Sequence, residues 1–132
     1  MAVKLVECLD WSAENRPGEL LRITDQLAKA GVNLDALWAY TSHNGESKMA
    51  AIAKTPDKLK GALKELGATT TRCFCATGTD KAGALVSLFR ALAEANINVE
   101  CLDALAVGGK YAAVFWVSEV DLSKAKEILR VR

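Results

Sequence analysis

The stretch Gly18–Ala39, GELLRITDQLAKAGVNLDALWA, is similar to a second stretch, Gly83–Ala104, GALVSLFRALAEANINVECLDA. The two align at an offset of 65 residues, and eight of the 22 aligned positions are identical. Cys8 and Cys73 are related by the same offset. Self-similarity at a fixed spacing indicates a duplicated structural unit. We therefore expect two related units, residues 1–67 and 68–132.

Both copies show the same succession of elements. In the first copy, alternating polarity and Val/Leu enrichment predict a strand over Val3–Leu9. Pro17 suits the first turn of a helix, and Gly31 suits its end. The apolar residues at helical spacing that should form the buried face of this helix are Leu20, Ile23, Leu27 and Ala30. Strands over 34–41 and 48–53 and a helix from Pro56, capped by Thr55, complete the copy. The second copy repeats the pattern over 71–77, 82–95, 99–107, 111–117 and 122–129.

The order strand–helix–strand–strand–helix, repeated twice, predicts an α+β chain of the ferredoxin-like class. Each unit should contain an antiparallel sheet with its helices on one face. A complete pair of such units needs about eight strands, whereas the sequence shows six. Either the segment Thr69–Thr77 serves both units, or strands are exchanged between them. The strands are apolar on both faces, so we also expect the helix-free face to pack against the other unit or another chain.

Composition excludes several classes of protein. The 132 residues include 17 Lys and Arg against 16 Asp and Glu, so there is no basic excess for binding nucleic acid. No apolar run is long enough to span a membrane. Charged residues near the N-terminus interrupt the stretch that a secretory signal would need, which predicts a cytoplasmic protein.

The chemistry-bearing residues do not form a recognisable catalytic set. The single histidine, His43, falls in the predicted Asn-Gly turn, so no Ser-His-Asp or Cys-His set can be assembled without it. No phosphate-binding or dinucleotide-binding glycine motif occurs, and no cofactor is predicted. The four cysteines lack the paired spacing of a zinc site, which favours reduced, buried thiols and predicts no metal site. A thiol or metal sensor remains the alternative.

The loop Glu14–Leu20 is the most informative candidate for ligand binding. The start of a helix offers unpaired N–H groups and the positive end of the helix dipole, which attract a carboxylate. Gly18 permits close approach, and the amide of Asn15 can both donate and accept. Asn33 lies at the far end of the helix, so the two amides should meet one ligand only across an interface. Alternatively, Asn15 caps the helix, and Asn33 and Asn98 hold turns.

The segment ENRPGEL (Glu14–Leu20), followed by AGVNL (Ala30–Leu34), resembles the ACT domain, a small regulatory domain of amino-acid metabolism. The first copy is similar to the serine-sensing domain of phosphoglycerate dehydrogenase, and the duplication extends the resemblance over nearly the whole chain. Where that domain has a histidine two residues before the motif's Asn, this chain has Ala13, and Asp80 replaces the second copy's Asn. The resemblance implies that effectors bind between the first loop of one domain and the second strand of its neighbour. The implied ligand-binding residues are Trp11, Asn15, Arg16, Pro17, Gly18, Asn33, Leu34, Asp80, Gly83, Asn98 and Val99.

Two of these residues also have ordinary structural explanations. Trp11 either covers a ligand or packs on a neighbouring unit, and Arg16 is either a ligand contact or a solvated side chain. We therefore predict a non-catalytic, tandem ACT protein that binds a small effector, an amino acid, without nucleic acid or membrane. Binding should modulate a homodimer or an enzyme of amino-acid metabolism. A ligand-free assembly subunit is the alternative function.

Overall fold

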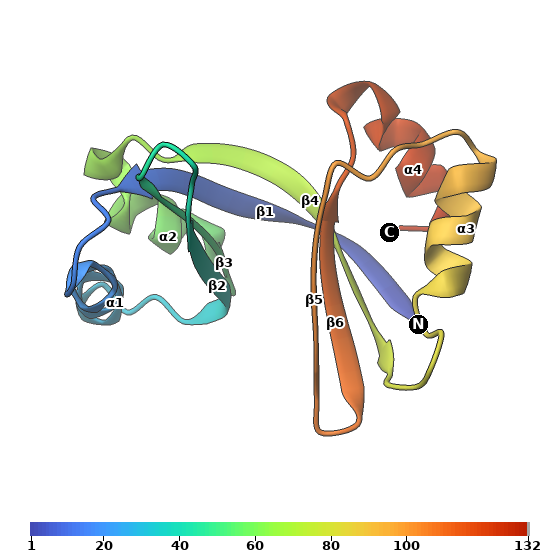
Figure 1. Cartoon of the computed structure of the whole chain (residues 1–132), viewed down its shortest axis with the longest axis horizontal. Coiled ribbons are helices and arrows are strands. Elements are labelled where there is room, and N and C mark those ends of the chain that lie inside the picture. The colour runs from blue at the N-terminus through green and yellow to red at the C-terminus, as the bar shows by residue number, and fades with distance from the viewer. Residues whose placement is uncertain (132) are drawn as a thin grey trace. The chain divides into compact units, whose positions relative to one another are not determined.

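The computed structural model describes residues 1–131, which contain six strands and four α-helices (Figure 1). The strands are β1 (Ala2–Ala13), β2 (Leu34–Thr41), β3 (Ser47–Ala53), β4 (Thr69–Thr79), β5 (Cys101–Val107) and β6 (Lys110–Trp116). The helices are α1 (Glu19–Lys29), α2 (Pro56–Ala62), α3 (Val86–Glu94) and α4 (Leu122–Ile128). Short 3-10 turns, η1 (Lys64–Leu66) and η2 (Glu119–Asp121), follow α2 and precede α4.

The chain divides into two compact units that share two long strands. The N-terminal unit is Glu7–Thr71, and the C-terminal unit combines Met1–Val6 with the chain from Arg72 onward. The strand order is β2-β3-β1-β4 in the N-terminal unit and β5-β6-β4-β1 in the C-terminal unit. β1 and β4 both continue from one unit into the other, so six strands supply four positions in each unit. This arrangement accounts for the strand count that the sequence left open.

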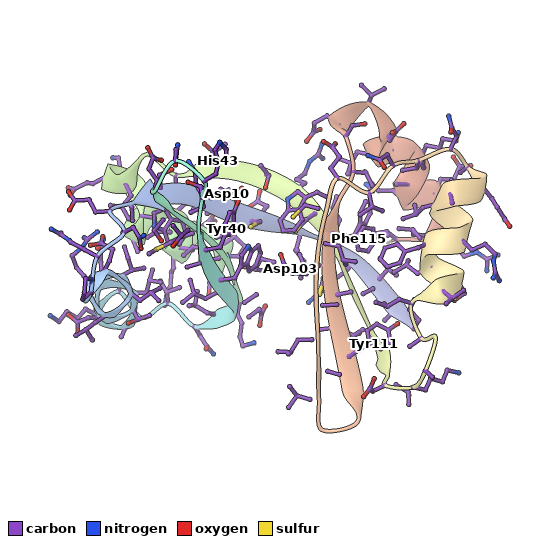
Figure 2. The ribbon with its side chains drawn as sticks, viewed as in Figure 1. Asp10, Tyr40, His43, Asp103, Tyr111 and Phe115 are labelled. Atoms are coloured by element: carbon purple, nitrogen blue, oxygen red, sulfur yellow. The ribbon has the colours of Figure 1, made fainter. Side chains whose placement is uncertain are left out.

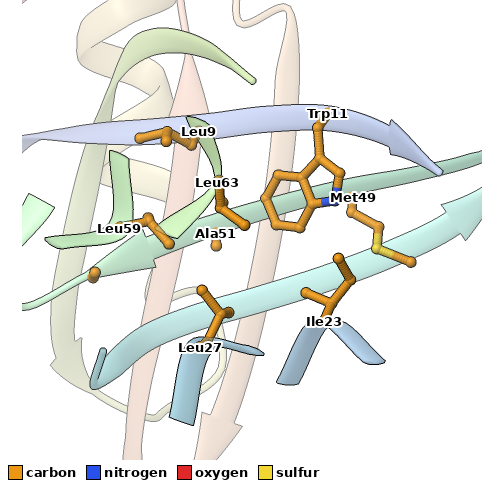
Figure 3. Close-up of a cluster of buried hydrophobic side chains, with 9 residues drawn as sticks. Leu9, Trp11, Ile23, Leu27, Met49, Ala51, Leu59 and Leu63 are labelled. Carbon is orange, nitrogen blue, oxygen red and sulfur yellow. The ribbon is translucent and has the colours of Figure 1, made fainter. Parts of the chain in front are cut away.

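The predicted α+β, ferredoxin-like class is confirmed. In the N-terminal unit, α1 and α2 pack on one face of the strands (Figure 3). The core residues are Leu9, Trp11, Ile23, Leu27, Met49, Ala51, Ala53, Leu59 and Leu63. The register pairs Leu9 with Ala51 and Trp11 with Met49, so alternate strand residues face the helices.

The C-terminal unit has its own core beneath α3 and α4. Two fully buried rings lie in this core, where Phe74 stacks on Phe115 at a centroid distance of 5.4 Å. The partly buried Phe89 packs against them and meets Phe115 edge-on at 5.6 Å. Both geometries are favourable for aromatic quadrupoles. Val3 and Leu5 of β1 pack against this cluster, which shows how the first residues of the chain complete the second unit.

The first helix of each unit begins later than the sequence pattern predicts, whereas α2 and α4 begin at the predicted residues, Pro56 and Leu122. α1 begins at Glu19 rather than Pro17, because Gly18 adopts a left-handed conformation at the N-cap (φ 87°). The buried row of α1 is Glu19, Ile23 and Leu27, spaced by four residues. Leu20 is therefore not part of the buried face, as the sequence analysis had expected, and is 48% exposed. α3 likewise begins at Val86, four residues after its predicted start.

Each unit ends at an edge strand, β2 or β5. β5 is exposed along its whole length, and Leu105 and Val107 are each 71% exposed. An apolar edge strand of this kind offers unpaired backbone groups and apolar surface to another strand. None of the helices within residues 1–131 is long and apolar enough to span a membrane.

Candidate functional site

A cavity of about 380 Å³ lies in the C-terminal unit, between the β4–α3 loop and strands β5 and β6. Two charged side chains, Asp80 and Lys81, stand in an otherwise mostly apolar wall. The other lining residues are Gly83, Ala84, Leu85, Val86, Ala104, Leu105, Ala106 and Tyr111. The cavity has the size and the mixed lining of a site for a small polar molecule.

Backbone hydrogen bonds fix the loop that forms one side of this cavity. The N–H of Asp80 donates to the carbonyl of Gly109 in the β5–β6 turn at 3.0 Å. The N–H of Ala84 donates to Lys81 at 3.1 Å, and the N–H of Val86 donates to Gly83 at 3.0 Å. Gly83 has a φ of 76°, a conformation that glycine adopts without strain. The loop is thus a folded turn that leads into α3.

Tyr111 forms the sheet side of the cavity. It extends from β6 on the side of α3, as does Phe115 (Figure 2). Gly78 lies opposite Tyr111 in the β4–β6 register. A Cβ at Gly78 would lie 2.7 Å from the ring's Cε1 and 2.9 Å from its Oη. The absence of a side chain at Gly78 therefore lets the tyrosine ring lie over β4.

The N-terminal unit places its predicted ligand residues differently. Asn15 lines a cavity of about 420 Å³ at the end of β1, together with Gly45 and Glu46 of the β2–β3 turn. Arg16, Pro17 and Gly18 are exposed in the turn before α1. Glu19 follows them, and its side chain is only 6% exposed.

Glu19 is bound by two arginines. Its Oε1 accepts a hydrogen bond from Nε of Arg22 at 3.1 Å, and its Oε2 accepts one from Nε of Arg16 at 3.3 Å. Arg16 also pairs with Glu14 at 2.9 Å. The hydrogen bond from Arg22 holds the pKa of Glu19 below its ordinary value, with a further contribution from Arg16. The carboxylate is therefore the stable form of this side chain.

Trp11 lies in the core rather than on a cavity wall. It is 4% exposed and packs with Ile23 and Met49 (Figure 3). Its Nε1 is the one buried side-chain nitrogen or oxygen within residues 1–131 that has no hydrogen-bond partner. The indole ring is thus part of the N-terminal core.

The remaining predicted ligand residues, Asn33, Leu34, Asn98 and Val99, follow the C-terminal ends of α1 and α3. The carbonyl of Asn33 accepts a hydrogen bond from the N–H of Lys54 at 3.1 Å, and Leu34 packs against the core. Asn98 and Val99 line a third cavity, of about 450 Å³, together with Phe89 and Leu102 among others. Asp80 and Gly83 thus line one cavity of the C-terminal unit, and Asn98 and Val99 line another.

The four cysteines differ in how far they are buried. Cys8 and Cys73 are buried, Cys75 is half-buried and Cys101 is exposed. Over residues 1–131, no group of three or more His, Cys, Asp or Glu side chains is arranged to hold a metal ion.

The predicted ligand-binding residues include only Asp80 and Gly83 of the lining of the cavity beside the β4–α3 loop, and they omit Lys81, Ala84 and Tyr111 as well as Glu19 of the N-terminal unit. Glu19 and Ala84 each directly follow a glycine, and their burial depends on where the helix begins, which the apolar spacing did not reveal. Tyr111 had a usable signal, because a glycine inside a strand often marks the close approach of a large neighbour.

Comparisons with known proteins identify the fold. No protein-family model matches the chain, and no curated protein matches it. A protein of Bacteroides thetaiotaomicron superposes with a TM-score of 0.84 at 25% identity, covering 97% of this chain and 88% of that one. The regulatory subunit of aspartate kinase from Thermus thermophilus, in a ligand-free form, gives 0.60 at 16% identity, with coverage of 98% and 93%. The corresponding subunit from Thermus flavus gives 0.61 at 17% identity, with coverage of 98% and 94%. The chain therefore has the fold of these regulatory subunits over nearly its whole length.

Proposed function

We propose that this chain is a non-catalytic regulatory module of the ACT type, which binds a free amino acid in the cavity beside Asp80 and passes the effect to another chain. The observation that carries the proposal is the lining of that cavity. Asp80 is suited to a ligand ammonium group, and Lys81 to a ligand carboxylate. The apolar wall of Leu85, Val86 and Leu105 favours a small apolar side chain.

The fold supports this function. The solved structures with this fold include regulatory subunits of aspartate kinase, an enzyme of amino-acid metabolism. A partner enzyme of the same kind is the simplest recipient of the signal. The expected affinity is modest: about seven ligand heavy atoms at roughly −1 kcal/mol each correspond to a Kd near 10 μM.

The edge strand β5 connects ligand binding to association. Ala104, Leu105 and Ala106 belong both to the cavity wall and to this exposed strand. A ligand in the cavity therefore contacts the surface on which a second copy of the chain would pair. Because the ligand favours whichever arrangement completes its contacts, binding shifts the equilibrium between free chains and a homodimer.

The test is a calorimetric screen of the purified chain against the twenty amino acids, with molar mass measured by light scattering with and without each ligand. We expect selective binding by one amino acid or a chemically similar group, and a change in the dimer fraction. Asp80→Ala should weaken that binding at least about tenfold, equivalent to about 1.4 kcal/mol. Asp57→Ala, an exposed carboxylate on α2, is the matched control and should leave binding unchanged.

The exposed β5 edge also favours a second function, a ligand-free assembly subunit. A stable dimer that binds none of the twenty amino acids would support this alternative and contradict the amino-acid sensor. Loss of the dimer in Leu105→Lys would then assign the interface to β5.

A further inference from the structure

The two units differ at one equivalent position, which is the first residue of α1 in one unit and lies two residues before α3 in the other. Gly18 and Gly83 have φ values of 87° and 76°. Glu19 directly follows the first glycine and Ala84 the second. Each also lies four residues before the first buried apolar residue of its helix, Ile23 in α1 and Leu88 in α3. Glu19 and Ala84 therefore occupy the same place in their units.

In the N-terminal unit, that place is filled by the chain itself. The side chain of Glu19 is 6% exposed, and both of its oxygens accept hydrogen bonds from arginines. Arg16 and Arg22 are the cations that a carboxylate ligand would need, and Glu19 already pairs with both of them, while Glu14 also pairs with Arg16. An external carboxylate would have to displace a buried, doubly bound one.

In the C-terminal unit, the same place is open. Ala84 contributes only a methyl group and lines the cavity of about 380 Å³. At the 65-residue offset, Lys81 replaces Arg16 and Ser87 replaces Arg22. The C-terminal unit thus keeps one cation and has no carboxylate at the position of Glu19, whereas the carboxylate of Asp80 lines the same cavity from the preceding turn.

The sheet beside this place differs as well. The strand register pairs Ala13 with Ser47 in the N-terminal unit and Gly78 with Tyr111 in the C-terminal unit. A large aromatic ring lies over a glycine in one unit, whereas two small residues stand opposite each other in the other. The strand residues beside Glu19 and those beside Ala84 therefore leave spaces of different shape.

We infer that Glu19 acts as an internal ligand that closes the N-terminal unit, and that the effector binds only in the C-terminal unit, beside Ala84. This inference rests on the proposed function for the identity of the effector. The part of the inference that concerns Glu19 does not depend on the proposed function. One chain therefore carries one effector site, although both units have the loop and helix start from which such a site is built.

The closure is tested with acetate, which can replace the missing side chain. In Glu19→Ala, Arg16 and Arg22 lose their shared partner, and acetate can enter the vacated space. We expect sodium acetate to raise the Tm of Glu19→Ala more than sodium chloride at the same ionic strength. The wild type and Glu19→Gln, which keeps the side-chain volume, should show no such difference. Equal acetate and chloride responses in folded Glu19→Ala would overturn the closure.

Amide NMR of the wild-type chain supplies the second test and needs no variant. Each of the twenty amino acids is titrated, and we expect perturbed resonances over Asp80–Val86 and Ala104–Ala106 only. Perturbation over Glu14–Leu21 would overturn the inference while leaving the proposed function intact. If no amino acid perturbs any resonance, the proposed function fails, and the acetate experiment still decides whether Glu19 closes the N-terminal unit.

A third test introduces the Glu–Arg pair of the N-terminal unit into the C-terminal unit. Ala84→Glu with Ser87→Arg reproduces the spacing of Glu19 and Arg22 in the C-terminal unit. The double variant should weaken amino-acid binding at least about tenfold. Ser123→Glu with Lys126→Arg, which places the same pair at the same spacing on α4 and outside the cavity lining, is the control and should bind as the wild type does. Undiminished binding by the folded double variant would contradict the inference.

Discussion

Gly78 and Tyr111 allow a quantitative test of how the cavity wall is built. In Gly78→Ala, the new Cβ would lie 2.7 Å from Cε1 of the tyrosine ring and 2.9 Å from its Oη. Ordinary carbon contacts need about 3.5 Å, so the ring must move by roughly 0.8 Å. Overpacking of this kind costs about 1–3 kcal/mol. Gly78 has no positive φ, so the alanine itself should recover about 0.4–1 kcal/mol by restricting the unfolded chain. We expect a net loss of about 1–2 kcal/mol.

Gly78→Ala should change the free energy of unfolding in the opposite direction when the tyrosine ring is absent. In a Tyr111→Ser background, Gly78→Ala recreates the small pair Ala13 and Ser47 of the N-terminal unit and removes the steric conflict. It should then stabilise the chain by about 0.4–1 kcal/mol. The double-mutant cycle therefore predicts a coupling energy of about 1.5–3 kcal/mol between the two positions.

Urea unfolding followed by circular dichroism measures all four members of the cycle. Ala13→Gly is the control in the N-terminal unit and should cost about 0.5–1 kcal/mol, because no large side chain takes the freed space. If Gly78→Ala changes the free energy of unfolding equally in both backgrounds, the ring does not depend on the glycine. The argument that Gly78 shapes the cavity would then be refuted.

Three further predictions concern charge and the exposed edge. Asp10 accepts a hydrogen bond from Thr71 at 3.2 Å, and burial raises its pKa despite that bond. The ionised form is therefore disfavoured in the folded state, and Asp10→Asn should raise the free energy of unfolding at pH 7, with the gain shrinking as the pH falls below the raised pKa. A gain that persists unchanged in acid would contradict this reasoning. The pKa shift of Glu19 has the opposite direction. Because its pKa is lowered in the folded state, Glu19 stabilises the fold at a pH above its unfolded pKa, and this stabilisation is lost as the pH falls through the folded pKa. The stability difference between wild type and Glu19→Gln, measured by urea unfolding from neutral to acid pH, should therefore disappear in acid. The proposed homodimer predicts that Leu105→Lys lowers the dimer fraction measured by light scattering. The substitution should change the free energy of unfolding of the monomer by less than about 0.5 kcal/mol, because Leu105 is 71% exposed. An unchanged dimer fraction would exclude β5 as the interface.

The order of elements could be predicted from sequence because it depends on local patterns. The alternation in Val3–Leu9 and the turns at Gly45 and Gly108 each fix a feature over a few residues. The extent of β1 and β4 could not be predicted in this way. Whether a strand continues for several residues beyond its apolar pattern depends on the neighbour that accepts its hydrogen bonds, and that neighbour is far away in the sequence.

The candidate site likewise contains residues that the sequence predicts and residues that it does not. Asp80 and Gly83 were identified from the repeat, because their positions correspond to Asn15 and Gly18 at the 65-residue offset. Tyr111 could not be placed beside them from sequence, since the β4–β6 and β5–β6 registers set it opposite Gly78 and Ala106. Spacing along the chain identifies the loop, whereas strand register determines what lies opposite it.

The burial of Glu19 follows from the start of α1. Similarity to a ligand-binding motif is strongest in Glu14–Leu20, yet that segment contains the carboxylate that fills its own unit. Because Gly18 adopts a left-handed conformation and the helix begins one residue later, Glu19 rather than Leu20 faces the sheet. A helix beginning at Pro17 would have left the same residues with a different buried face. Motif residues therefore define a binding site only together with the rotation of the helix that carries them, and that rotation makes Glu19 an occupant of the site rather than a contact for a ligand.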